Sequence, residues 1–235
     1  MRNRFLSMVL VIACGVIFAS CGGGSGSGSN SGGGVKKNTH LGLLPSIYAD
    51  YNAKVKAQEA KVEEEGKKLM AGGEKNTAKL MKLMTDDETT TKAMKEKLKV
   101  AVGEEIAKLT DKEIPVTFSK ALLDSDELFY NVAPATLVAE KDRLSIAFSF
   151  SAKNVFEVPR LKGHDFGTYF RLVAADGSTI IKTVLLPVKL ENKAFTITAG
   201  DQLLEYKLPL SISNMAEAYS NFAGVEFITK AEYNK

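Results

Sequence analysis

The spacing of apolar positions changes once along the chain, close to residue 113. Upstream of it, a first run of mostly apolar positions is spaced four and three residues apart, which is typical of one face of an α-helix. We call this run the seam, because it would face a neighbouring helix. The run consists of Leu44, Tyr48, Tyr51, Val55, Gln58, Val62, Glu65 and Leu69. Pro45 suits the first turn of a helix, and Gly72-Gly73 suits its end.

A second helical pattern runs from about residue 74 to residue 109. Its apolar positions are Leu80, Leu83, Met84, Met94, Leu98, Ala101, Ile106 and Leu109. The segment TDDETTT (85–91) interrupts it, and Thr85 with Glu88 could form a capping box that starts a new helix. Residues 43–112 therefore predict either a long antiparallel helical hairpin, which we favour, or three helices. The remaining Lys and Glu side chains indicate solvated faces.

From residue 113 onward, short strand-like runs separated by turn signals replace the helical pattern. The runs are 114–119, 128–133, 135–140, 144–152, 168–174, 179–186, 194–198, 203–212 and 224–229. In 144–150, apolar Leu, Ile and Phe alternate with Ser and Ala, as in a half-buried strand. Asp176-Gly177 predicts a hairpin turn, Pro209 a strand end or edge, and residues 213–222 a short helix.

The predicted fold class is α+β, with the helical segment followed by an antiparallel β-sandwich over 113–235. The run YFRLVAADGSTI (169–180) resembles the strand, acidic-glycine turn and strand of immunoglobulin-like modules in bacterial envelope lipoproteins. The Cys–Trp–Cys signature of antibody domains is absent, since the chain has no Trp. The term immunoglobulin-like therefore describes the expected architecture only.

The N-terminal 20 residues have the layout of a secretory signal peptide. Arg2 and Arg4 precede an apolar run over 5–19, and small residues Ala19 and Ser20 precede Cys21. An apolar run of this length is short for a spanning helix, which needs about 20 residues. We therefore expect residues 1–20 to be removed during export.

The stretch Phe18-Ala19-Ser20-Cys21 resembles the lipobox of bacterial lipoproteins. That resemblance implies a Cys21 whose thiol carries diacylglycerol and whose new amine is acylated after cleavage. Cys14, after Val11-Ile12-Ala13, fits the consensus as well, but cleavage there would leave apolar GVIFA on the mature chain. Cys21 is the favoured site, and a signal peptide without lipidation is the third alternative.

The segment from Cys21 to residue 42 is predicted to be a flexible tether. Residues 22–34 comprise eight Gly, four Ser and one Asn, which cannot bury apolar area. Such a tract has a root-mean-square reach of about 20 Å. Together with several acyl chains, which hold a protein stably where one does not, it would anchor a folded body at a membrane. Gly22, rather than an acidic residue, resembles lipoproteins sent to the outer membrane.

The whole layout resembles small bacterial envelope lipoproteins of Gram-negative anaerobes, a group that brings no established activity with it. Our leading hypothesis is a non-catalytic, lipid-anchored protein whose β-sandwich mediates binding or assembly in the cell envelope, with an envelope protein or glycan as its partner. An alternative function is a helix-mediated scaffold or a homodimer formed through the helices. Light scattering would separate the leading hypothesis from this alternative, because a strict monomer argues against dimers formed through the helices.

Charge argues against nucleic acid as a partner. Residues 36–113 contain 16 Lys and 14 acidic residues, and residues 114–235 contain 13 basic and 14 acidic ones. Neither part has the clustered basic surface that binds phosphates.

Candidate chemistry is sparse in this chain. The loop 158–168 holds Arg160, Lys162 and His164, which could form a weak cationic ligand site, and a hydrolase site near His164 is the least favoured function. His40 is expected in solvent. Asp124, Asp126 and Glu127 suit a capped turn better than a Ca²⁺ site, because the EF-hand loop is missing. No cofactor or metal is predicted, and both Cys residues lie before residue 22.

Overall fold

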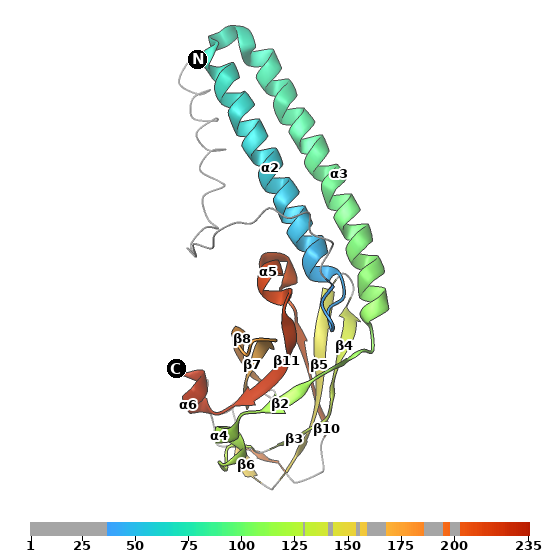
Figure 1. Ribbon diagram of the computed structural model, residues 1–235, viewed down its shortest axis with the longest axis vertical. Coiled ribbons are helices and arrows are strands. Elements are labelled where there is room, and N and C mark those ends of the chain that lie inside the picture. Colours follow the sequence, from blue (N-terminus) through green and yellow to red (C-terminus); the bar gives the residue numbers. More distant parts are fainter. Residues whose placement is uncertain are drawn as a thin grey trace. The chain divides into compact units, whose positions relative to one another are not determined.

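The computed structural model describes residues 37–128, 130–140, 143–153, 156–158, 168–185, 195–197 and 203–235. The chain begins with two long helices, α2 (Leu44–Ala71) and α3 (Thr77–Leu109), joined by the short 3₁₀ helix η1 (Gly73–Asn76). The two helices lie side by side and antiparallel (Figure 1). The amide of Asn76 donates to the carbonyl of Leu69 at 3.0 Å, which satisfies one free carbonyl at the end of α2. The predicted helical hairpin is therefore present.

Helix α3 continues without a break through residues 85–91, so the three-helix alternative is wrong. The hydroxyls of Thr85, Thr89 and Thr90 donate to the carbonyls four residues earlier, at 3.1, 2.9 and 2.7 Å. A threonine that starts a helix would instead accept a hydrogen bond from a later N–H. These side chains thus bond within the helix, as Thr can do on a solvated face.

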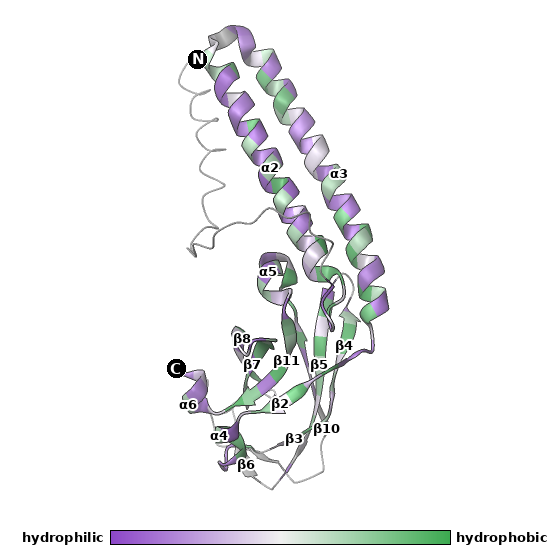
Figure 2. Ribbon diagram, in the orientation of Figure 1, coloured by the Kyte–Doolittle hydropathy of each residue, from purple (hydrophilic) through white to green (hydrophobic). Residues whose placement is uncertain are grey.

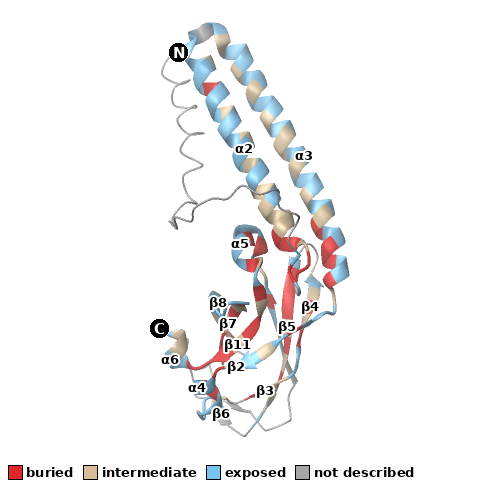
Figure 3. Cartoon of the chain, in the orientation of Figure 1, coloured by how far each residue is buried: buried red, intermediate tan, exposed pale blue. Residues whose placement is uncertain are grey.

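The seam between the two helices follows the predicted positions with one shift. Gly66, rather than Glu65, is the buried residue of α2 at this level. Gln58 donates to Asp87 at 3.0 Å across the seam, so a polar pair links the middle turns. Figures 2 and 3 show that polar residues cover much of both helices and that burial concentrates where they approach the strands. The outer turns of the hairpin contribute little to the core.

The first sheet contains five antiparallel strands. Four follow the order β1-β4-β5-β10, and β3 also pairs with β5. Their bounds are β1 Glu113–Ile114, β3 Tyr130–Val132, β4 Ala135–Glu140, β5 Arg143–Ala152 and β10 Leu203–Pro209. The alternation predicted for 144–150 is confirmed at its apolar positions, which are buried, whereas Ser145 on the opposite face is buried as well and donates to Glu140. Pro209 ends β10, which is the last strand in the order, as expected for a residue without an N–H.

The second sheet contains four strands in the order β2-β11-β7-β8. Their bounds are β2 Val116–Phe118, β7 Thr168–Ala174, β8 Thr179–Leu185 and β11 Phe222–Ile228. The predicted turn at Asp176-Gly177 joins β7 and β8, and Gly177 has the positive φ (81°) that such turns need. Two further strands, β6 Phe156–Val158 and β9 Phe195–Ile197, pair with each other.

One strand pair departs from the predicted antiparallel pattern, because β2 and β11 are parallel. They are the first and last strands of this sheet along the chain, so no short turn fixes their relative direction. The chain passes from β1 in one sheet to β2 in the other at Pro115, whose carbonyl accepts from the N–H of Val225 at 2.9 Å. A Cβ at Gly224 would lie 2.6 Å from that carbonyl oxygen, so this approach requires glycine.

Aromatic side chains from both sheets meet in the core. The ring of Phe148 on β5 lies 5.5 Å from that of Phe170 on β7 and 6.0 Å from that of Phe227 on β11. Leu41, Leu44, Ile106 and Leu109, from the base of the hairpin and the turn before it, belong to the same cluster. The helices and sheets thus share one core, within a unit that spans Val35–Lys235.

Short helical turns complete the described chain. They are α4 Lys120–Leu123, η2 Ile212–Asn214, α5 Ala216–Tyr219 and α6 Lys230–Tyr233. The predicted helix over 213–222 corresponds to η2 and α5, whereas α4, α6 and β6 were not predicted. Among the described residues, no helix is both long enough and apolar enough to cross a membrane.

Candidate functional site

The first described residues form a tight turn that is fixed to the folded body, and we call residues 38–43 the clasp. The side-chain amide of Asn38 donates to the carbonyls of Ser220 and Phe222, at 2.9 and 3.0 Å. Its Oδ1 accepts from the N–H groups of His40 and Leu41, both at 2.8 Å. An Asn that bonds its own backbone two and three residues on stabilises such a turn. The clasp therefore connects the start of the folded chain to the segment before β11.

His40 does not lie free in solvent, as the sequence had led us to expect. It is half-buried, and its ring meets that of Phe222 edge to face at a centroid distance of 6.2 Å. Burial lowers the pKa of His40 from its ordinary value because the charged imidazolium loses hydration. Its position favours the neutral ring and a packing role.

A buried carboxylate holds the other end of the clasp. Glu105 on α3 accepts from the backbone N–H of Leu43 at 2.9 Å and from Lys108 Nζ at 3.1 Å. Burial alone would raise the pKa of Glu105, but the bonds from Leu43 and Lys108 and the nearby charge of Lys37 outweigh it and lower the pKa. Gly42 adopts φ of +57°, and a Cβ there would collide with the Glu105 carboxylate. The position of the Glu105 carboxylate therefore requires glycine at position 42.

A groove lies beside the clasp, where the hairpin base approaches β5 and the end of β10; we call it the base groove. It has a volume of about 420 Å³. Its lining consists of Leu44, Tyr48, Ile106, Arg143, Leu144, Pro209, Leu210, Ser211, Ile212, Ser213 and Asn214. Ligand sites typically occupy roughly 300–1,000 Å³. The base groove is therefore large enough for a small molecule or a few residues of a peptide.

Local hydrogen bonds fix both walls of the base groove. Tyr48 lies one helical turn after Leu44, so both side chains face the same side of α2. The N–H of Leu210 donates to the carbonyl of Leu144 at 2.9 Å, and the amide of Asn52 donates to the carbonyl of Ser213 at 2.9 Å. The second bond ties α2 directly to the segment that leads into η2. The walls are thus held from both the helical and the strand side.

Arg143 is the one charged residue in the lining of the base groove. Among the described residues, none makes a hydrogen bond or ion pair with its guanidinium. Glu140, the cross-strand partner of Arg143, bonds to Lys207 and to Ser145, each at 3.1 Å. These bonds, together with the charges of Lys207 and Arg143, lower the pKa of Glu140. The groove therefore presents a positive charge that attracts Glu140 and makes no hydrogen bond or ion pair with any residue that the structure describes.

A second hollow of about 400 Å³ lies where the chain crosses between the sheets. Its lining is His40, Glu113, Ile114, Pro115, Val116, Phe118, Val132, Ala133 and Pro134. Apolar side chains dominate it, and it offers few groups that could orient a ligand. We regard the base groove as the better candidate.

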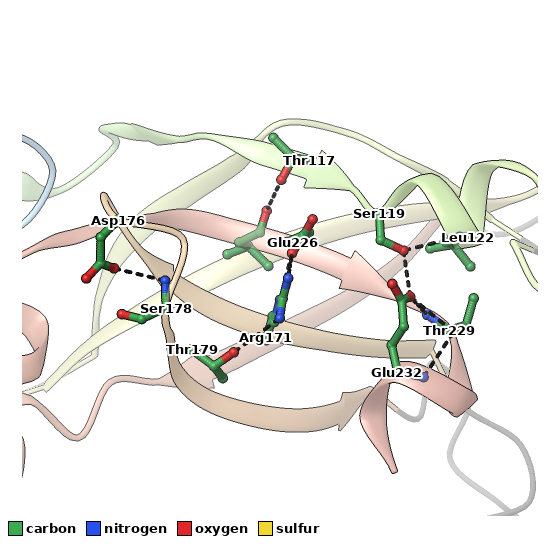
Figure 4. A network of polar contacts seen from close by, with 11 residues as sticks. Thr117, Ser119, Leu122, Arg171, Asp176, Ser178, Thr179, Glu226, Thr229 and Glu232 are labelled. Carbon is green, nitrogen blue, oxygen red and sulfur yellow. Dashed lines mark hydrogen bonds and ion pairs between the residues drawn. The ribbon is translucent and has the colours of Figure 1, made fainter. Parts of the chain in front are cut away.

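The polar contacts in Figure 4 have structural roles. Ser119 accepts from the N–H of Leu122 and donates to Glu232 Oε2, which also accepts from the N–H and hydroxyl of Thr229 (Figure 4). The bond from Ser119, followed by those from Thr229, lowers the pKa of Glu232. These bonds cap α4 and α6 and join them. Both side chains are thus held in these caps, since Ser119 accepts from Leu122 while Glu232 accepts from Thr229.

The Arg171–Glu226 pair in the same view bridges neighbouring strands. Arg171 on β7 lies opposite Glu226 on β11, and their closest nitrogen–oxygen distance is 2.6 Å (Figure 4). Arg171 also donates to the hydroxyl of Thr179 on β8 at 3.3 Å. The guanidinium is therefore committed to three strands of one sheet and is not free for a ligand.

The predicted site residues Cys21, Arg160, Lys162 and His164 all lie outside the described residues. The 124–127 segment is a turn after α4, in which Ser125 donates to the carbonyl of Leu122 at 3.0 Å. Glu127 accepts from the N–H of Lys230 at 2.9 Å. No group of three or more His, Cys, Asp or Glu suited to a metal ion occurs in the part of the chain that the structure describes.

Sequence reasoning missed both the clasp and the base groove. Asn38 directly follows a Gly-rich tract and has its partners 182 and 184 positions away, so no local pattern marks it. The groove combines four separate segments of the chain. The available signal was a single Arg at the start of a strongly alternating strand. Compared with protein-family models, curated proteins and solved structures, the chain matches none of them.

Proposed function

We propose that this chain is a lipid-anchored, non-catalytic protein of the bacterial cell envelope, whose β module binds a ligand or partner close to a membrane. The observation that carries the proposal is the order of N-terminal features. Basic residues, an apolar run, small residues before Cys21 and a Gly/Ser tract follow one another. In this proposal residues 1–20 are removed, acyl groups on Cys21 hold the membrane, and residues 22–34 separate it from the folded unit.

The position of the clasp supports this proposal. A tether is useful when its end is attached firmly to the folded body, and Asn38 provides such an attachment through buried hydrogen bonds. The body also carries a groove whose walls are fixed by hydrogen bonds. These features favour binding over catalysis.

We further propose that the β module is an immunoglobulin-like sandwich. Two sheets share an aromatic core through Phe148, Phe170 and Phe227, and the chain changes sheets at Pro115. Facing sheets with a common core are the general architecture of such sandwiches. An experimental structure of the mature protein would test the proposal through the strand order of the segments between β5 and β10.

Metabolic labelling with an alkyne-bearing fatty acid tests the lipid anchor. The wild-type chain should take up the label and sediment with membranes, and Cys21→Ser should lose both properties. Cys14→Ser is the matched control, because it removes the other thiol and should keep the label. Label retained in Cys21→Ser and lost in Cys14→Ser would move the cleavage site to Cys14. An unlabelled wild-type chain would refute the lipid anchor.

A helix-mediated scaffold is a second candidate, favoured by the outer turns of the hairpin. Met70, Met81 and Met84 are 53, 66 and 46 % exposed, although Met usually packs against apolar neighbours. Because no thiol follows Cys21 in the sequence, Met84→Cys would introduce a unique cross-linking site. Cross-linked dimers at low protein concentration would support the scaffold, and a strict monomer would exclude helix-driven dimers.

A further inference from the structure

We propose that the base groove binds a small ligand through a carboxylate group, with Arg143 as the residue that recognises it. This inference deepens the proposed binding role and rests on it, but it does not depend on the lipid anchor. It assigns a ligand class to a site that the N-terminal features leave unspecified.

The charge of the groove selects an anion. Arg143 provides the one formal charge of the lining, and none of the other lining residues carries a carboxylate. The guanidinium presents donors in a planar fork that matches the two oxygens of a carboxylate. Glu140 attracts Arg143 but is bonded to Lys207 and Ser145, so among the described residues a ligand carboxylate would find no partner hydrogen-bonded to the guanidinium. A single cation fits a monoanion better than a highly charged ligand.

The remaining lining combines apolar and polar groups. Leu44, Ile106, Leu144 and Ile212 line the groove but are almost fully buried, so they expose little apolar surface to it. Ser211, Ser213 and Asn214, which are exposed, add polar groups. Most of the open surface of the groove is therefore polar. Such a lining suits a small acid whose carboxylate lies at Arg143 and whose remaining atoms contact both kinds of side chain.

The groove is also built in advance of binding. Its strand wall is fixed by the Leu210–Leu144 backbone bond, and its helical wall by the Asn52–Ser213 bond. Glu105 and the clasp fix the start of α2, from which Leu44 and Tyr48 project. A preformed site loses less conformational entropy when a ligand binds. The geometry therefore favours a small ligand over one that must first open the hairpin.

Two sources could supply this chemistry, namely the carboxyl terminus of a short peptide and a free organic acid. The probes are N-acetyl-Leu-Ala with a free carboxyl group, the same dipeptide with an amidated terminus, and hexanoate. Binding to the mature protein in detergent is measured by ligand-observed NMR. We expect at least one acid to bind, and amidation to weaken dipeptide binding about tenfold or more, as loss of a charge-assisted hydrogen bond would.

Substitutions in the groove complete the test. Arg143→Gln should weaken binding of the acid about tenfold, and Arg143→Lys should restore part of it because the charge returns without the fork. Lys99→Gln is the matched control, since it removes an exposed charge on α3 away from the groove lining and should change nothing. Thermal unfolding of each variant checks that the fold is retained.

The outcomes separate cleanly. Binding by the peptide acid alone assigns a peptide terminus, binding by hexanoate alone assigns an organic acid, and either supports the proposal. Equal binding of acid and amide, unchanged binding in Arg143→Gln, or no binding of either acid at millimolar concentration would overturn it. Fatty-acid labelling of the same preparation reports the anchor independently, so a failed groove and a failed anchor are distinguishable.

Discussion

The carboxylate of Glu105 accepts a hydrogen bond from the backbone N–H of Leu43 at 2.9 Å, although 62 positions separate the two residues. The bond satisfies an N–H at the start of α2, where the helix itself provides no acceptor. It also brings the first turn of α2 against the last turns of α3. A single side chain on one helix thereby caps the other and closes the base of the hairpin.

Replacing Glu105 should destabilise the protein. Glu105→Ala leaves the Leu43 N–H without its acceptor, and we expect a loss of about 1–3 kcal/mol in the free energy of unfolding. Glu105→Gln retains an acceptor and should lose less. Urea denaturation at neutral pH measures both variants. Equal stability of wild type and Glu105→Ala would show that water replaces the bond at no cost.

The same carboxylate predicts an acid dependence. The folded-state pKa of Glu105 is lowered, so its stabilising contribution is present above the unfolded-state pKa. It is lost as the pH falls below about 4.5 and through the lowered folded-state pKa. The stability difference between wild type and Glu105→Gln should therefore shrink between pH 6 and pH 3 (roughly the range of carboxyl titration). A difference that stays constant with pH would contradict this assignment.

Asn38→Ala should release the clasp. The substitution removes the four hydrogen bonds of the Asn38 side chain described above, and buried groups left without partners cost about 1–3 kcal/mol each. Hydrogen exchange of residues 38–43 should speed up more than that of β5. Asn38→Asp keeps the acceptor but loses the donor, so it separates the turn from the attachment to Ser220 and Phe222. Unchanged exchange in both variants would refute the clasp.

Gly66→Ala should stabilise the hairpin. Gly66 lies inside α2, and a Cβ built there meets nothing within 4 Å. Replacing a mid-helix Gly with Ala typically gains about 0.5–1 kcal/mol. Gly42→Ala is the contrasting variant, because its positive φ and the neighbouring Glu105 predict destabilisation. Thermal unfolding of both would reveal opposite shifts in Tm.

The aromatic core should be the most sensitive region. Phe227 is fully buried and contacts rings from both sheets, so Phe227→Ala should lose about 3–5 kcal/mol. Leu123 is 61 % exposed, and Leu123→Ala should change stability by less than about 0.5 kcal/mol. Comparable losses for both variants would mean that the sheets do not share the core described here.

Regular elements with a strong period were predictable from the sequence, and contacts between distant segments were not. The alternation in β5 and the Asp176-Gly177 turn follow from local patterns, and both were found. The segment TDDETTT (85–91) suggested a helix start that the structure does not have, because polar residues suit both a helix start and a solvated helix face. Strand β2 pairs with β11, and the hydrogen bond between Thr117 and Val225 joins residues 108 positions apart. No local signal specifies that pairing or its direction.

The candidate site illustrates the same limit. Arg143 is visible in the sequence as a polar residue before an alternating strand, but its meeting with Tyr48 and Ser213 depends on how the hairpin base packs. The sequence favoured the segment 158–168 as a site because cationic residues lie within a few positions of one another there. Proximity in sequence can be read from the chain directly, whereas proximity in the fold depends on how distant segments pack.

The clasp also determines how a mechanical load would travel through the molecule. A pull on the chain ahead of Lys37 reaches Asn38 first, and its amide passes the force to the carbonyls of Ser220 and Phe222 beside β11. The load thus enters the β-sheet before it reaches α2. The part of the load that continues along the clasp reaches Leu43, whose N–H bonds to Glu105, so the tension is shared between β11 and the base of the hairpin.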